Sequence, residues 1–88
     1  MILISNYQNT RLTNQIFKLL PMYEHGEEWE KQLETIVLEL HGYNDMFNNN
    51  AQFMILIAKL LALQYIEEQV SFRKVVFEAL SILKEIKI

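Results

Sequence analysis

Apolar residues recur at helical spacing through most of the chain and predict four helices. The clearest stripe has apolar residues three and four positions apart, which places them on one side of a helix. Its members are Trp29, Leu33, Ile36, Val37 and Leu40. Because His41 and Gly42 follow as stop signals, we expect this helix over residues 27–41.

Residues 51–68 are apolar on nearly every side of a helix, with Asn50 as a natural N-cap. A helix without a polar face has to be covered on most sides. We therefore expect residues 51–68 to form the central element. The preceding stretch, residues 43–50, is asparagine-rich and predicts a loop.

The two ends of the chain predict different structures. Residues 72–88 carry a second amphipathic stripe, with Ser71 as the expected N-cap. Residues 1–12 mix polar and apolar positions and predict an extended or fraying arm. After this arm, Thr13 is the expected cap of a helix that Pro21 ends or kinks and that Gly26 closes.

Composition narrows the fold class. Of the 88 residues, 51% are hydrophobic, 2 are glycine, 1 is proline and none is cysteine. Disulfide frameworks are excluded, and a turn-rich β-sandwich is disfavoured because tight turns use glycine and proline. The predicted fold is all-α: a bundle of about four helices, or two stacked helical hairpins, around the helix 51–68. Residues 13–88 form its single domain.

Charge disfavours nucleic acid as a partner. The net charge is −3, and residues 27–47 hold six carboxylates and a single lysine, whereas nucleic-acid binding needs a basic face. The most apolar run, residues 53–66, is too short to span a bilayer and is interrupted by Lys59. No membrane span is expected, and the predicted location is cytoplasmic.

Few residues suggest chemistry. His25 and His41 each stand beside a glycine at an expected helix end, where histidine compensates the helix dipole. Glu30 and Glu34 share a solvated helix face, whereas acid–base catalysis needs a carboxylate that is buried or held by a partner group. The sequence therefore predicts no enzyme, no cofactor and no metal, although a ligand-binding or metal-binding bundle centred on either histidine stays an alternative.

The apolar surplus carries the functional hypothesis. A domain this small leaves much of its surface exposed, so apolar residues beyond the main stripes predict a partner-binding surface. These residues are Leu38, Phe47, Phe77, Leu80 and Ile86. The expected function is a non-enzymatic helical protein-binding module, such as a small chaperone, an adaptor or a subunit of an obligate homo- or hetero-oligomer.

Three alternatives stay open. The protein could be a small inhibitor or immunity-like protein of microbial or phage origin. It could be a transcription regulator that docks helix 72–88, with its lysines and Arg73, on DNA. It could also be a well-packed monomer whose exposed aliphatic side chains are merely scattered.

Overall fold

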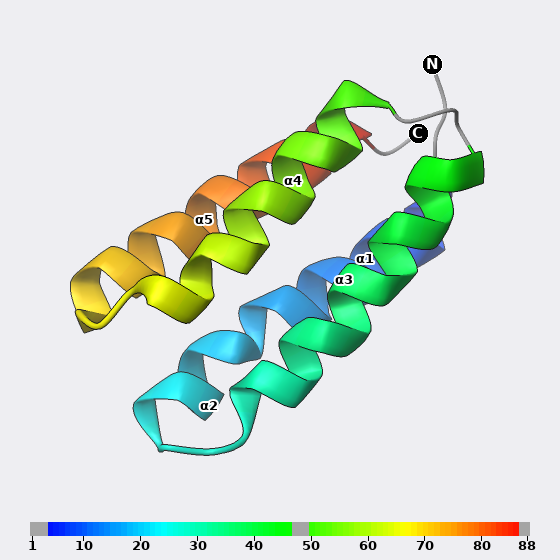
Figure 1. The fold of residues 1–88 in the computed structure, drawn as a ribbon. Coiled ribbons are helices and arrows are strands. Elements are labelled where there is room, and N and C mark those ends of the chain that lie inside the picture. Colours follow the sequence, from blue (N-terminus) through cyan, green and yellow to red (C-terminus); the bar gives the residue numbers. More distant parts are fainter. Residues whose placement is uncertain (1–3, 47–49, 87–88) are drawn as a thin grey trace.

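A computed structural model describes residues 4–46 and 50–86, and these form four helical arms packed side by side (Figure 1). The elements are α1 (Asn6–Phe17), α2 (Leu19–Glu24), α3 (Trp29–Met46), α4 (Ala51–Ala62), a 3₁₀ turn (Leu63–Tyr65) and α5 (Gln69–Ile86). Helices α1 and α2 follow one another along the first arm. The all-α bundle of four helices is confirmed.

Successive arms run in opposite directions. The start of α1, the end of α3, the start of α4 and the end of α5 meet at one end of the bundle (Figure 1). Helix α1 packs against α3 and α5, and α4 packs against the same two helices, so α1 and α4 lie diagonally opposite. Each arm therefore turns one side toward the common core and another side outward.

The first helix begins earlier than expected. Ser5 is its N-cap: the Ser5 hydroxyl accepts a 3.1 Å hydrogen bond from the main-chain nitrogen of Gln8, and the Gln8 side chain lies 3.4 Å from the Ser5 nitrogen. This reciprocal arrangement is a capping box. Leu12 is fully buried in the core. Residues 5–12 are thus ordered helix and cap, and the prediction of an arm that ends at Thr13 is wrong for them.

A break at Lys18 separates α1 from α2. Pro21 lies in the first turn of α2, where it has no amide hydrogen to donate to the carbonyl of Phe17. The helix is therefore interrupted at Lys18. The main-chain nitrogen of Lys18 still donates a 3.0 Å hydrogen bond to the carbonyl of Asn14. The predicted kink before Pro21 corresponds to this break.

The closing turn of α2 follows the glycine signal. Gly26 adopts the left-handed conformation, with φ of 68°. Its nitrogen donates to the carbonyl of Tyr23 over 3.3 Å, and the nitrogen of Glu27 donates to Met22 over 2.9 Å. These two bonds form a Schellman motif. The predicted stop at Gly26 is confirmed.

The third helix does not stop at Gly42. It continues to Met46 because the next turn is held by packing: Asn44 is buried, and the ring of Tyr43 stacks on Phe53 of α4 at 6.1 Å. A glycine inside a helix costs only about 1 kcal/mol, which these contacts outweigh. The prediction that the helix ends at residue 41 is wrong.

The hairpin of α4 and α5 also differs from expectation at its turn. Helix α4 ends at Ala62 and passes into the 3₁₀ turn, so the helix predicted over 51–68 is shorter. Helix α5 starts at Gln69, and the nitrogen of Phe72 donates to the carbonyl of Glu68 over 2.9 Å. Ser71 therefore lies inside the helix and does not cap it.

The core runs along the axis of the bundle and receives side chains from every arm. Its largest fully buried members include Leu12, Ile16, Leu33, Ile36, Leu40, Phe53, Leu56, Leu60, Phe72 and Leu83. An aromatic cluster closes one end: Tyr23 stacks on Phe72 at 3.9 Å, and Trp29 meets Phe72 edge-on at 5.0 Å. The tryptophan predicted as a core residue is buried here.

Candidate functional site

The outward side of α4 carries a group of exposed apolar residues. Phe53, Leu56 and Leu60 point into the core, and the residues between them point away from it. The exposed ones are Ala51, Met54, Ile55, Ala58, Leu61 and Ala62, and they continue into Tyr65 of the 3₁₀ turn. We call these seven residues the α4 face. Met54 is 53% exposed, Ile55 51% and Leu61 39%.

The α4 face exists because α4 occupies one wall of the bundle. Among the described helices, α3 and α5 pack against it. Within the part of the chain that the structure describes, these helices cover the inner side of α4. Residues three and four positions apart are neighbours on a helix surface, which makes the α4 face continuous. It carries no charged side chain.

A groove between α3 and α4 extends the α4 face. It encloses about 380 Å³ and brings Leu38 of α3 alongside Leu61 of α4, above the buried Val37. Leu38, predicted as a partner-binding residue, is 65% exposed. Glu30 and Glu34 line the same groove. Lys31 and His41 line it too, so the groove combines apolar walls with two carboxylates, one lysine and one imidazole.

The charges around this groove differ in whether they are paired. On the α5 side, Lys59 forms a 3.2 Å ion pair with Glu78. On the α3 side, Lys31 forms a 3.3 Å ion pair with Glu28. Within residues 4–46 and 50–86, no ion pair involves Glu30 or Glu34. The unpaired charge that lines the groove is negative.

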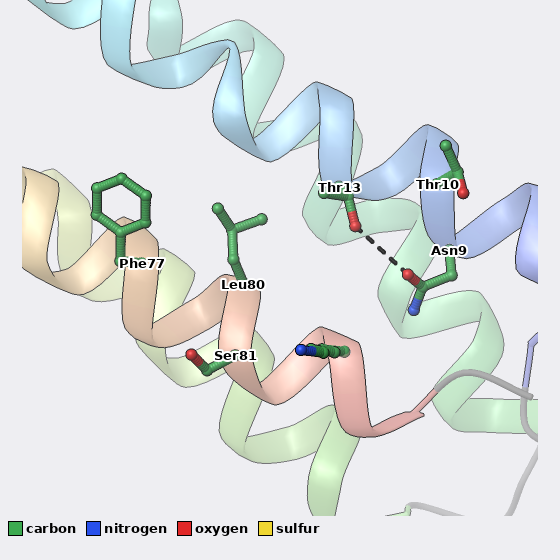
Figure 2. A pocket seen from close by; sticks show the side chains of 7 residues that line it. Asn9, Thr10, Thr13, Phe77, Leu80 and Ser81 are labelled. Atoms are coloured by element: carbon green, nitrogen blue, oxygen red, sulfur yellow. Dashed lines mark hydrogen bonds between the residues drawn. The ribbon is translucent and has the colours of Figure 1, made fainter.

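Phe77 and Leu80 lie in a different place. They line a groove of about 440 Å³ between α5 and α1, opposite Asn9 and Thr13 (Figure 2). Phe77 is 45% exposed and meets the ring of Phe17 edge-on at 6.0 Å, and Leu80 is half-buried against the core. Because α1 and α4 are diagonal, this groove and Leu38 are on opposite sides of the bundle.

The remaining two predicted partner-binding residues do not extend either surface. Ile86 is fully buried in the core, since it follows Leu83 by three positions on the inner stripe of α5. Its prediction as a surface residue is wrong. Phe47 lies outside the described residues.

The histidines are both exposed and lie apart from the core. His25 is the C-cap of α2, and His41 lines the groove between α3 and α4. Among the described residues, no three side chains of His, Cys, Asp or Glu gather closely enough to hold a metal ion.

The shifted titrations belong to contacts between helices. Arg11 of α1 donates both terminal nitrogens to the carboxylate of Glu39 on α3, and the Tyr43 hydroxyl donates to the same carboxylate over 3.2 Å. The contact with Arg11 holds the pKa of Glu39 below its usual value, and burial raises the pKa of Tyr43. Arg73 likewise lowers the pKa of Glu24, to which it donates over 3.0 Å. These groups tie helices together.

The basic residues of α5 do not share one environment. Arg73 is paired with Glu24 of α2, and Lys84 lines the groove between α1 and α5. Lys87 lies outside the described residues. Lys74 is exposed. Of the basic residues in the DNA-docking alternative, Arg73 therefore already holds an ion pair with a carboxylate.

Comparison with known proteins identifies no relative: no family model, no curated protein and no solved structure matches the chain. In the described part of the chain, no helix has the length and apolar character needed to cross a membrane.

The α4 face was not predicted from the sequence as an exposed surface. Its signal was present: Ala51, Ala58 and Ala62, with larger apolar residues between them, repeat at helical spacing opposite the Phe53 stripe. Because residues 51–68 were expected to form a central helix, these alanines were expected to be buried in the core.

Proposed function

We propose that the protein is a non-enzymatic binding module that contacts another protein through the α4 face and Leu38. The observation that carries this proposal is that an entire side of α4 is both exposed and uncharged. Contiguous exposed apolar surface of this kind marks interaction sites, because its exposure to water is unfavourable until a partner covers it. Chaperones, adaptors, inhibitors and complex subunits all belong to this class.

A binding role is also supported by the contacts of the titratable side chains. The groups with shifted pKa values are engaged in contacts between helices, as Arg11 is with Glu39. None of these groups lines the α4 face. The polar residues thus stabilise the bundle, and the rigid bundle presents α4.

Site-specific photocrosslinking tests the proposal. A photoreactive residue placed at Ala58, in the middle of the α4 face, should give a crosslinked product of defined mass in cells that make the protein. The matched control places the same residue at Asn14, which is exposed on α1, diagonally across the bundle. This control should give no such product.

The complementary measurement is sedimentation of the purified protein over a concentration series. A product from position 58 that contains a second copy of the chain would agree with self-association seen by sedimentation. If position 58 gives no product and the protein sediments as a monomer throughout, the proposed function is wrong.

A further inference from the structure

We infer that the groove between α3 and α4 receives an amphipathic helix of a partner protein, whose apolar stripe is flanked by lysine or arginine. This inference rests on the proposed function and adds the chemistry of the partner. It follows from two independent features of the groove: its apolar walls and the sign of its unpaired charges.

The apolar walls suit a helix. Leu38 lines the groove from α3 and Leu61 from α4. Ala58 and Ala62 are exposed on the adjoining α4 face, three positions before and one after Leu61. Small residues let the axis of a docked helix approach closely, and leucine-like side chains at i, i+3, i+4 and i+7 fill such grooves. An extended strand would need an unpaired sheet edge, and the described residues near this groove are helical.

The charges select a basic helix. Glu30 and Glu34 are one helical turn apart, both are exposed, and both line the groove. Neither has an ion-pair partner among the described residues, whereas Lys31 is engaged by Glu28 and Lys59 by Glu78. Two cationic side chains of a partner, also one turn apart, would match these carboxylates and set the direction of the docked helix.

The same charges disfavour a second copy of this chain. In a two-fold contact centred on this groove, the same surface faces its own copy, so Glu30 and Glu34 of one copy lie near those of the other. Like charges placed opposite each other oppose association. A basic partner instead places opposite charges against Glu30 and Glu34.

The test uses two fluorescent synthetic peptides and the 88-residue protein. Each peptide has about 18 residues, long enough for several helical turns, and the same leucines at i, i+3, i+4 and i+7 spacing. One carries lysines beside the leucine stripe, and the other carries glutamates at those positions. Fluorescence anisotropy should show binding of the lysine peptide, weakened by salt, and binding at least about tenfold weaker for the glutamate peptide.

Variants locate the effect. Glu30→Lys combined with Glu34→Lys should weaken binding of the lysine peptide by about tenfold or more. The matched control, Glu67→Lys with Glu85→Lys, changes the net charge equally at two exposed positions that do not line the groove, and it should bind as the wild type does. Ala58→Glu, at the centre of the α4 face, should weaken binding of either peptide.

The outcomes separate this inference from the proposed function. Equal binding of both peptides, lost in Ala58→Glu, overturns the basic partner and supports binding through the α4 face. If neither peptide binds, the inference is wrong, and crosslinking at position 58 then decides the proposed function alone. A wild-type dimer that Ala58→Glu dissociates and the lysine peptide does not disturb would assign the α4 face to a second copy.

Discussion

The side-chain nitrogen of Asn9 donates a 2.8 Å hydrogen bond to the main-chain carbonyl of Leu83, 74 residues further along the chain. Asn9 is only 6% exposed, and Leu83 lies in the last turn of α5. Carbonyls in the last turn of a helix lack partners within the helix, so a side chain from α1 supplies one. This bond joins the first and last arms of the bundle.

Replacing Asn9 by alanine should destabilise the protein. The Leu83 carbonyl would lose its partner in a buried position, which costs about 1–3 kcal/mol in the free energy of unfolding. Urea titration followed by far-ultraviolet circular dichroism measures this loss. Asn14→Ala is the control, since Asn14 is exposed on the same helix and gains only the helix propensity of alanine. Equal effects of the two variants would contradict the structural role of Asn9.

The contact of Arg11 with Glu39 predicts how stability depends on pH. Because the folded-state pKa of Glu39 lies below its ordinary value of 4.5, its stabilising contribution is present above that value. It is lost as pH falls through the folded pKa. Glu39→Gln should therefore lower the free energy of unfolding by about 1 kcal/mol at neutral pH, and the difference from wild type should shrink toward pH 3.

Glu34→Gln is the control for this pH series. Glu34 is exposed and makes no ion pair in the described part of the chain, so this variant should follow the wild type at neutral pH. Urea titrations at several pH values measure both variants. A Glu39→Gln difference that stays constant from neutral to acidic pH would exclude ionised Glu39 as the cause of its effect.

The two predicted partner-binding residues Ile86 and Leu38 should respond oppositely to truncation. Ile86→Ala removes a fully buried side chain and should cost about 2–5 kcal/mol in stability. Leu38→Ala removes a side chain that is 65% exposed and should change stability by about 0.5 kcal/mol or less. Thermal unfolding of both variants measures the contrast. Similar destabilisation in both would show that Leu38 is a core residue.

The predictions that succeeded were those in which one periodic pattern determined the answer. The stripe from Trp29 to Leu40 has only one helical interpretation, and those residues are buried as expected. Gly26 follows the short helix α2 and adopts the left-handed conformation, so the glycine alone determined where that helix ends. In contrast, the capping box of Ser5 and Gln8 was present in the sequence but was not used, because the polar residues around it resembled an arm.

The position of α4 could not be obtained from periodicity. A helix that is apolar on all sides is compatible with a central position and equally with a wall whose outer side binds a partner. Only the packing of α1 against α3 and α5, which fills the fourth place in the bundle, shows that nothing described covers Ala58 and Ile55. The same topology separates Phe77 from Leu38, although both are exposed apolar residues.

The two glycines provide a final test, because the structure gives them opposite roles. Gly42 lies inside α3 with open space around it, so Gly42→Ala should raise the free energy of unfolding by about 0.5–1 kcal/mol through helix propensity. Gly26 has a φ of 68°, which an alanine rarely adopts. Gly26→Ala should therefore lower the free energy of unfolding by about 1–2 kcal/mol, although the space around Gly26 is equally open. Chemical denaturation measures both. The position of Gly42 beside His41 first indicates that it ends the helix in the left-handed conformation. In that case both substitutions would destabilise the protein. The sign of the Gly42→Ala effect therefore decides whether α3 continues to Met46.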